Sequence, residues 1–248
     1  MNEVYARNKI YITHTEQDVL RHKKIYLAGC GIGSNIAECA LRLGFENFTL
    51  VDGDRIELSN LNRQNYDFKD VGCYKTDSLM NRLMNINPFA NVKTITSYLT
   101  THNIDDSIID HNIAVNALDF QSETPFIFDK LCQEKYRIPV LHPYNLGWAT
   151  LVFVLMPNEP NLSIISTDYR GFEKKVVSFL IEKLEENTKV WVQDVLSEYE
   201  EKWQGQSPPQ LSIGSCLAAG VCTNIMYRLA TQKSVRSFPD FYFLTIEL

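Results

Sequence analysis

Carboxylates, amides and two cations are concentrated in one short stretch of the sequence, directly after the apolar run 48–51. They are Asp52, Asp54, Asn60, Arg63, Gln64 and Lys75. A carboxylate at a strand end can accept both hydroxyls of a ribose, and cations beside it can hold phosphate oxygens. This combination of residue types predicts a nucleotide-binding site.

Three glycines come shortly before this stretch. Gly29, Gly31 and Gly33 follow the apolar run 25–28 and lead into a helical pattern. Glycines let the backbone turn tightly and approach a phosphate, and the start of a helix offers free N–H groups and the positive end of its dipole. The pattern departs from the full dinucleotide-binding fingerprint, because Ser34 stands at its sixth position. We interpret residues 29–33, the glycine turn, as a phosphate cradle.

Arg63 and Lys75 distinguish this site from that of a dinucleotide oxidoreductase. A hydride-transfer site does not need two cations beside the phosphates. Nucleotidyl transfer does, because negative charge develops on the leaving pyrophosphate. We therefore expect nucleotidyl transfer, and an NAD-dependent oxidoreductase is the weaker alternative.

The elements that must position these residues alternate between strands and helices, a pattern typical of βα units and a mainly parallel sheet. The expected strands are 25–28, 48–52, 92–95, 113–117, 139–142 and 149–155. The expected helices are 13–21, 33–43, 75–85 and 124–136, and the first is capped by Thr13 or Thr15. The predicted fold is α/β, with a Rossmann-like, doubly wound, mainly parallel sheet.

The chain changes character after Pro157. Residues 157–210 are bracketed by prolines, and their middle part, 173–202, is strongly charged and carries two amphipathic helical patterns. An apolar helix is expected over 212–230 and a closing strand over 241–246. We therefore expect three segments: a nucleotide-binding core over 1–156, a helical excursion over 157–210, and a C-terminal helix and strand over 211–248 that complete the core.

The composition is that of a globular protein, with 45% hydrophobic and 22% charged residues among 248. No apolar run reaches the roughly 18 to 20 residues that cross a bilayer, and the first residues lack the apolar core of a signal peptide. We expect a cytoplasmic protein without membrane contact. The net charge of −6 gives no footprint for nonspecific nucleic-acid binding, so protein or small-molecule partners are favoured.

The motifs resemble those of the ThiF/MoeB/HesA adenylyltransferases, the bacterial relatives of ubiquitin-activating enzymes. The resemblance rests on the glycine turn, on D-x-D-x-[IV]-x-x-S-N-L-x-R-Q over 52–64, on V-G-x-x-K over 71–75, on Asn87-Pro88 and on Asp119. It covers roughly residues 6–156 and continues weakly through 212–248. By this resemblance, residues 1–156 form an adenylation core.

The resemblance implies a reaction and roles for residues. The C-terminal carboxylate of a small ubiquitin-like protein, a sulfur-carrier protein or a peptide would attack the α-phosphate of ATP and release pyrophosphate. The implied catalytic residues are Arg63, Lys75, Asp119 and Arg7, and Asp119 would also bind Mg²⁺. The implied ATP contacts are Gly29, Gly31, Gly33, Asp52, Asp54, Asn60 and Gln64. Family members are commonly homodimers in which an arginine near the N-terminus, here Arg7, enters the partner's site.

Three departures limit what the resemblance implies. The glycine turn is one residue shorter than the usual G-x-G-G-[ILV]-G, and the two C-x-x-C pairs that hold zinc in many members are missing, so we expect no zinc site. The excursion carries no cysteine where thioester-forming members keep their nucleophile, so we expect no covalent relay. The six cysteines are expected to be reduced and mostly buried, and we interpret Cys30 and Cys216 as packing thiols.

Two alternatives keep the same fold but do not adenylate a protein or peptide. The tRNA threonylcarbamoyladenosine dehydratase has these motifs, but an enzyme that binds tRNA is expected to have a basic surface. The acidic total argues against that reading, although Lys174, Lys175 and Lys183 leave room for a local patch. A catalytically silent scaffold is the other alternative, and the retained charged residues of the site argue against it.

Overall fold

A seven-stranded sheet forms the centre of the protein in a computed structural model, which describes residues 3–202 and 208–246. The described strands are β1 (Lys24–Ala28), β2 (Asn47–Val51), β3 (Asn91–Ile95), β4 (Ile113–Asn116), β5 (Val140–Asn145), β6 (Ala149–Leu155) and β7 (Tyr242–Thr245). Their order is β3-β2-β1-β4-β5-β6-β7. The first five pair in parallel, and β6 and β7 add antiparallel strands. The predicted mainly parallel α/β fold is confirmed.

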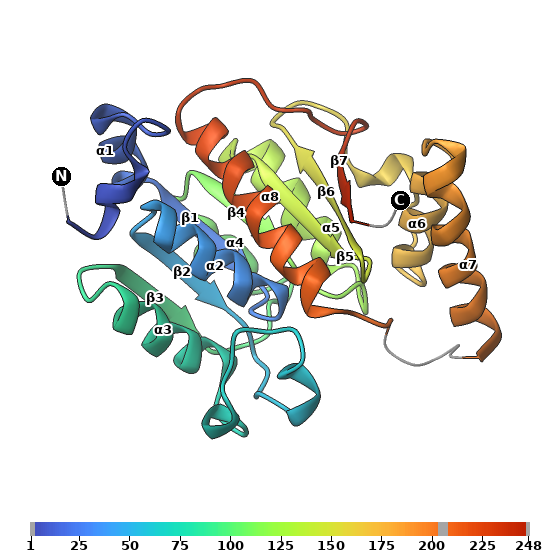
Figure 1. The fold of residues 1–248 in the computed structure, drawn as a ribbon, viewed down its shortest axis with the longest axis horizontal. Coiled ribbons are helices and arrows are strands. Elements are labelled where there is room, and N and C mark those ends of the chain that lie inside the picture. Colours follow the sequence, from blue (N-terminus) through green and yellow to red (C-terminus); the bar gives the residue numbers. More distant parts are fainter. Residues whose placement is uncertain (1–2, 203–207, 247–248) are drawn as a thin grey trace.

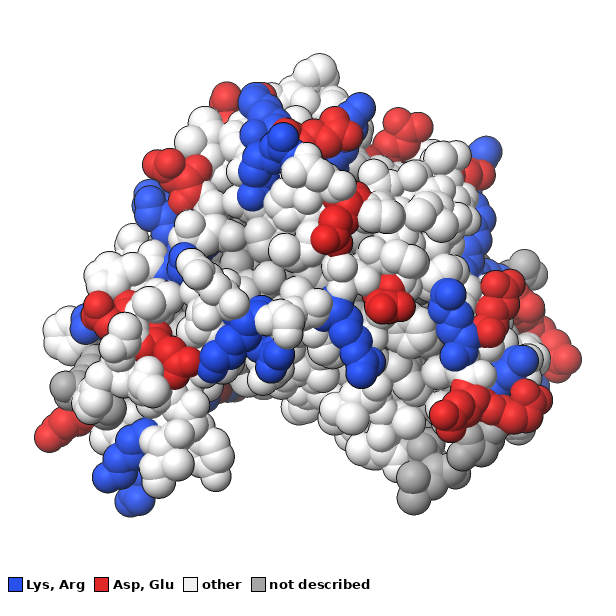
Figure 2. Space-filling model, turned by 90° about the horizontal axis from the view of Figure 1, so that it is seen from above, with Lys and Arg blue, Asp and Glu red and all other residues white. Residues whose placement is uncertain are grey.

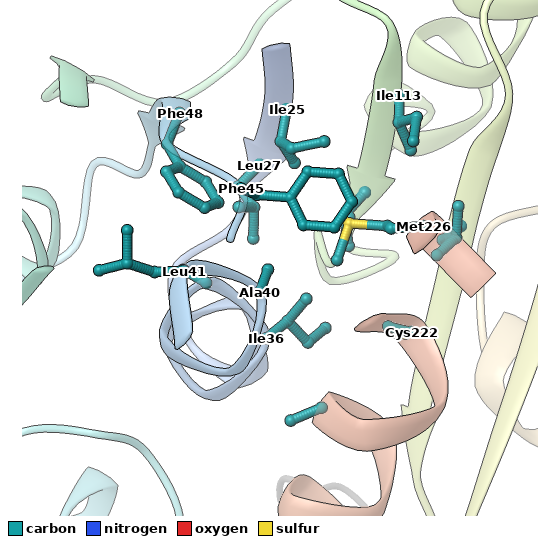
Figure 3. Close-up of a cluster of buried hydrophobic side chains, with 14 of the residues drawn as sticks. Ile25, Leu27, Ile36, Ala40, Leu41, Phe45, Phe48, Ile113, Cys222 and Met226 are labelled. Carbon is teal, nitrogen blue, oxygen red and sulfur yellow. The ribbon is translucent and has the colours of Figure 1, made fainter. Parts of the chain in front are cut away.

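One face of the sheet is covered by α2 (Ile32–Leu43), α3 (Lys75–Ile86) and α8 (Ser212–Ala230), with α1 (His14–His22) beside them (Figure 1). Side chains alternate across a strand, so Ile25 and Leu27 of β1 both point to this face. There they meet Ile36 of α2 and Met226 of α8 (Figure 3). The contact between α2 and α8 therefore ties the C-terminal part of the chain to the core.

The opposite face is covered by α4 (Ile104–Ile108), α5 (Thr124–Lys130), the π-helical turn η4 (Leu131–Tyr136) and α6 (Phe172–Ile181). Tyr26 and Ala28 of β1 point to this side and pack with Phe128 of α5 and Phe172 of α6 in a second core cluster. Outside α6 lies α7 (Glu186–Lys202), at the margin of the molecule (Figure 1). Helices on both faces make the sheet doubly wound.

The helical excursion supplies part of this second core. Its two predicted amphipathic helices are α6 and α7, and α6 buries Phe172, Val176 and Leu180 against the sheet. The chain then returns to the first face as α8, whose bounds match the predicted 212–230. The division of the chain into three segments stays a prediction.

Two expected elements differ from the structure, and one helix is additional. The predicted helix 124–136 is α5 followed by η4, and the short helix α4 was not predicted. The predicted strand 139–142 continues as β5 past Pro143, a residue without an N–H group. Pro143 pairs with Val152 of β6, while the pairing of β5 with β4 is recorded only as far as Leu141. Since β4 is not paired with β5 at this position, the missing N–H of Pro143 costs no hydrogen bond to β4.

Helix α1 begins as expected. Thr13 caps it by accepting the backbone N–H of Glu16, and Glu16 accepts the backbone N–H of Thr13 in return. This capping box makes Thr13, and not Thr15, the N-cap of α1.

The surface carries both signs of charge. On the face seen in Figure 2, Lys and Arg side chains are interspersed with Asp and Glu. Among the described helices, none has the length and apolar character that a bilayer span demands. All six cysteines are free, but Cys73 and Cys216 are exposed, so the expectation that cysteines are mostly buried is wrong for these two.

Candidate functional site

The glycine turn lies at the carboxyl edge of the sheet, where strands β1 to β5 end. Gly29 directly follows β1 with φ +93°, a conformation that favours glycine. Its N–H donates to the carbonyl of Val51 over 2.8 Å, and a side chain on Gly29 would overlap the Ala117 carbonyl oxygen after β4. The turn is therefore confined between the ends of the two strands that flank β1.

The loop after β2, residues 52–74 (the β2 loop), folds over this turn. Ser34 of α2 donates its hydroxyl to the carbonyl of Gly31 over 2.7 Å and accepts the N–H of Asn65 over 3.0 Å. The Gln64 amide nitrogen lies 3.2 Å from where a Cβ on Gly31 would be. Gly33 lies in the first turn of α2, against Leu27.

Gln64 carries an unsatisfied acceptor. Its Oε1 is buried and has no hydrogen-bond partner among the residues described. Buried polar atoms are nearly always bonded, so this oxygen calls for a donor from a bound molecule or from water. The glycine turn, the open acceptor and the cations nearby fit a nucleotide.

Asp52 joins the glycine turn to the β2 loop. Its Oδ2 accepts the N–H of Cys30 over 2.7 Å, and its Oδ1 accepts the N–H of Asp54 over 2.8 Å. Burial raises the pKa of Asp52, and the nearby charge of Lys75 offsets part of that rise. Each carboxylate oxygen has capacity for a second hydrogen bond, such as one from a ribose hydroxyl.

Lys75 is the first residue of α3 and is buried. Its Nζ donates to Asp54 Oδ2 over 2.7 Å, and the Tyr98 hydroxyl donates to Asp54 Oδ1 over 2.7 Å. Burial alone would raise the pKa of Asp54, but the bonds from Lys75 and Tyr98 outweigh it and hold the pKa below its usual value. The carboxylate is therefore charged and bound on both oxygens.

Arg63 is held by the far end of the excursion. Its Nε donates to Gln210 Oε1 over 2.6 Å, and its Nη1 donates to the carbonyl of Ser59 over 2.8 Å. Burial lowers the pKa of Arg63, and the charge of Asp119 acts in the opposite direction. Asn60 is buried near by and uses its Oδ1 to accept the N–H of Glu57, which shapes the β2 loop at η2 (Leu58–Asn60).

Asp119 follows β4 at the carboxyl edge, and its residue surface is exposed. Desolvation by the surrounding protein raises its pKa, and the charge of Glu173 raises it further. Lys75 and Arg63 lower it, so both cations are close enough to act on Asp119. Glu173 belongs to α6, and its Oε1 accepts the N–H of Phe120 over 3.2 Å. The excursion therefore reaches the site a second time.

Arg7 lies away from this group. It is exposed in the short helix η1 (Glu3–Asn8), and the neighbouring Asn8 donates to the carbonyl of Leu43 at the far end of α2. The glycine turn is at the start of α2, so Arg7 lies near the amino edge of the sheet, where strands β1 to β5 begin. Its entry into a partner's site stays a prediction.

Three residues of the site were not predicted: Tyr98, Glu173 and Gln210. Tyr98 follows β3, so the rule that ligands bind at the carboxyl ends of parallel strands could have found it. Glu173 and Gln210 come from the excursion, where no local pattern distinguishes them from solvated polar residues.

His142 and Cys30 have packing roles near the site. His142 is buried and bonds Asp129 through Nε2 over 2.7 Å. Cys30 is buried, and burial raises the pKa of its thiol well above the usual value. The expectation of a buried Cys216 is wrong, because this residue lies on the outer side of α8.

The sequence matches the ThiF family over residues 5–241. It is 30% identical over 159 residues to the sulfur carrier protein ThiS adenylyltransferase of Bacillus subtilis, covering 62% of this chain and 47% of that protein. It is 29% identical over 141 residues to a probable molybdopterin-synthase adenylyltransferase of Gracilaria tenuistipitata var. liui, covering 55% of this chain and 39% of that one. It is 31% identical over 91 residues to the tRNA threonylcarbamoyladenosine dehydratase of Escherichia coli, covering 36% and 34%. The chain spans less than half the length of each of these relatives.

Solved structures share the fold. E. coli MccB with ATP superposes with a TM-score of 0.70 at 18% identity, covering 99% of this chain and 72% of MccB. PaaA superposes with a TM-score of 0.68 at 19% identity, covering 94% and 72%. MccB has also been solved with AMPCPP and MccA. At these identities the similarity shows the fold.

Proposed function

Since this chain belongs to the ThiF family, we propose that it is an ATP-dependent adenylyltransferase that activates a carboxylate. The observation that carries the proposal is the hydrogen-bonded cluster at the carboxyl edge, where Asp52 bonds the glycine turn at Cys30 and Lys75 bonds Asp54. The charges of Lys75 and Arg63 both lower the pKa of the nearby Asp119. Related proteins named for adenylyl transfer support the same activity.

The reaction we propose is attack of an acceptor carboxylate oxygen on the α-phosphorus of ATP. The bond from the α-phosphorus to the bridging oxygen breaks, and pyrophosphate leaves with that oxygen and its electron pair. Asp52 would bind the ribose hydroxyls, and the glycine turn would bind phosphate. Lys75 and Arg63 would stabilise the charge that grows on the leaving group. They are held in place beforehand, so their contribution needs little reorganisation.

Asp119 would hold Mg²⁺. In the described parts of the chain, no group of three or more His, Cys, Asp or Glu side chains could hold a metal. Mg²⁺ commonly binds one or two protein carboxylates together with phosphate oxygens, so one exposed aspartate at the carboxyl edge fits that use. A bound Mg²⁺ would supply neutralising charge on the phosphates.

The acceptor we propose is the C-terminal carboxylate of a small ubiquitin-like protein, a sulfur-carrier protein or a peptide. A relative is named for acting on the sulfur carrier ThiS, and the fold is shared with MccB solved with MccA. We further propose a cytoplasmic homodimer in which Arg7 of one copy completes the site of the other. The exposure of Arg7 is compatible with that role.

A tRNA dehydratase remains the second candidate, because one relative bears that name. Of the three lysines that could form a basic patch for tRNA, one has an acidic partner and two contact neutral groups. Lys174 pairs with Glu200, and Lys175 bonds Ser166 and the carbonyl of Asp168. Lys183 lies over the ring of Phe179. The net charge of −6 favours adenylation of a protein or peptide over a tRNA substrate.

ATP–pyrophosphate exchange tests the proposal. The purified protein is given candidate carrier proteins with free Gly-Gly ends and, separately, unmodified and threonylcarbamoylated tRNA. We expect exchange that depends on a carrier or peptide. Turnover with modified tRNA alone would move the assignment to the dehydratase, and nucleotide binding without exchange would point to a silent scaffold.

A pair of aspartate variants controls this experiment. Asp119→Asn removes the charge expected to hold Mg²⁺ and should lower exchange by about two orders of magnitude. Asp105→Asn removes a carboxylate of α4 that bonds Lys135 and Tyr136 of η4, and it should leave the exchange rate unchanged.

A further inference from the structure

A tyrosine outside the predicted motifs closes a chain of three polar side chains at the carboxyl edge. Tyr98 donates its hydroxyl to Asp54 Oδ1 over 2.7 Å, and Lys75 Nζ donates to Asp54 Oδ2 over 2.7 Å. The three residues, here the Tyr98 triad, come from the segment after β3, the β2 loop and the start of α3. The triad therefore exists only in the folded chain.

The backbone of Asp54 is fixed as well. Its N–H donates to Asp52 Oδ1 over 2.8 Å, and its carbonyl accepts the N–H of Lys75 over 3.0 Å. Asp54 is thus connected on one side to the carboxylate expected to hold the ribose and on the other to the helix that carries the cation.

The ring of Tyr98 covers the backbone between the two aspartates. A Cβ on Gly53 would lie 2.7 to 2.8 Å from three atoms of that ring. Tyr98 is nevertheless 65% exposed. A tyrosine side chain so exposed gains little free energy from burial. Its main side-chain interaction is therefore the hydrogen bond from its hydroxyl to Asp54.

The charges of the triad explain why Asp54 needs a second partner. The side chain of Lys75 is 10% exposed and that of Asp54 is 47% exposed. A nearly buried ammonium needs a fixed counter-charge, but a half-exposed carboxylate is free to turn toward water, and such pairs alone contribute little. The Tyr98 hydroxyl occupies the other carboxylate oxygen and removes that freedom.

We propose that Tyr98 is a positioning residue of the nucleotide site, which holds Lys75 through Asp54 where the pyrophosphate charge develops. The proposal rests on the adenylyltransferase function proposed above. A cation fixed before the substrate arrives favours the transition state more than the bound ground state. Loss of the hydroxyl should therefore affect kcat more than the KM for ATP.

A double-mutant cycle measures this coupling. In ATP–pyrophosphate exchange, Tyr98→Phe should lower kcat about fivefold to tenfold and change the KM for ATP less than about twofold. Asp54→Asn should lower kcat further. If Tyr98 acts through Asp54, adding Tyr98→Phe to Asp54→Asn should have no additional effect. Multiplied losses in the double variant, or a loss in KM alone, would overturn the proposal.

The chain contains a matched control. Tyr136 donates its hydroxyl to Asp105 Oδ1 over 2.7 Å, and Lys135 bonds Oδ2 of the same carboxylate. These residues, here the Tyr136 triad, repeat the same order of groups away from the site. Tyr136→Phe should leave kcat and KM within about twofold of wild type. An equal loss of kcat in Tyr98→Phe and Tyr136→Phe would show a general structural effect and contradict the proposal.

A second readout needs neither ATP nor acceptor. Lysines of the full chain are acetylated with limiting acetic anhydride and quantified by mass spectrometry. Labelling of Lys75, relative to Lys135, should rise about threefold or more in Tyr98→Phe, because the amine leaves its carboxylate. Unchanged labelling would overturn the positioning role even if exchange is observed. Increased labelling in a protein without exchange would keep the positioning role and reject the adenylyltransferase function.

Discussion

The two edges of the sheet carry the same groups under different conditions. The Tyr98 triad at the carboxyl edge and the Tyr136 triad near the amino edge both join a tyrosine hydroxyl, a carboxylate and a lysine. The lysine side chain is 10% exposed in the first and 53% exposed in the second. The same three groups thus hold a buried lysine charge at the carboxyl edge and a solvated lysine charge at the amino edge.

A hollow by itself does not mark a ligand site. The amino edge contains a hollow of about 600 Å³, lined by His111 and by both Lys135 and Tyr136. Both ring nitrogens of His111 already have partners, the carbonyl of Ile108 at 2.9 Å and the Thr49 hydroxyl at 2.8 Å. His111 therefore has no free ring nitrogen to offer a ligand.

The acidic residues show the difference most clearly. At the carboxyl edge, desolvation raises the pKa of Asp52 and of Asp119. At the amino edge, a hydrogen bond from Lys233 and others from Thr13 lower the pKa of Glu16 to about 2. Desolvation thus disfavours the charged forms of Asp52 and Asp119 in the candidate site, whereas hydrogen bonds favour the charged forms of Asp54 in that site and of Glu16 at the amino edge.

Replacing the two lysines should separate the edges most strongly. Lys75→Met removes the buried cation, and we expect kcat for ATP–pyrophosphate exchange to fall about 10²- to 10³-fold, because the leaving charge loses a preorganised partner. Lys135→Met removes the solvated cation and should stay within about twofold of wild type. Initial rates at saturating ATP make the measurement, and equal losses would remove the difference between the edges.

Two glycine substitutions should come next in size. Gly29→Ala places a side chain at φ +93° and against the Ala117 carbonyl. We expect it to cost about 2–3 kcal/mol in the free energy of unfolding and to abolish ATP binding. Gly44→Ala at the end of α2 also has positive φ, but its new methyl meets the flexible end of Gln17. It should lower stability by about 1–2 kcal/mol and leave ATP binding intact.

Urea unfolding and calorimetric titration with ATP compare the two glycine variants. Retained ATP affinity in a folded Gly29→Ala protein would contradict the assignment of the glycine turn as a phosphate cradle.

The contact between Arg63 and Gln210 offers a smaller test. Gln210→Ala removes the acceptor on Arg63 Nε, and kcat should fall about threefold to tenfold because the guanidinium is less well oriented. Glu46→Gln alters the pair of Glu46 with Arg21 at the amino edge and should change stability without changing kcat. Steady-state exchange and thermal melts on both variants separate these effects. A Gln210 variant with unchanged kcat would show that Arg63 needs no such support.

The smallest expected effect depends on pH. The pKa of Glu16 is about 2 in the fold against an ordinary value of 4.5, so its ionised form stabilises the protein above pH 4.5. This contribution declines as the pH falls toward 2. Glu16→Gln should therefore melt about 1–2 °C below wild type at pH 7, and the gap should close in acid. Exchange at pH 7 should be unaffected, and a gap that widens in acid would reverse the assigned sign.

Local sequence patterns predicted most of the fold and most of the site residues that come from the segment before the excursion. Apolar runs ended where strands end, so Asp52 and Asp119 could be assigned to the carboxyl edge before their neighbours were known. Thr13 carried a capping signal that the structure uses. These features depend on residues close in sequence, which is where pattern and propensity are informative.

Long-range contacts account for what was missed. Gln210 is 147 positions from Arg63, and Glu173 reaches the site from a helix whose sequence reads only as amphipathic. No periodicity encodes which distant segment will arrive at a strand end. The predicted strand 139–142 ends too early for the same reason, because a proline can stand within β5 only where the neighbouring strand β4 is no longer paired.

The return of the chain at Gln210 has a consequence for protein synthesis. Strands β1 to β5 and the β2 loop leave the ribosome well before residue 210, and adjacent parallel strands can begin to pair during that interval. Arg63 has no Gln210 to bond until the excursion has been made. A nascent chain released before that residue would carry most of the proposed nucleotide site, with Arg63 unsupported. Competent ATP chemistry should therefore appear late in translation, after α8 has closed on α2.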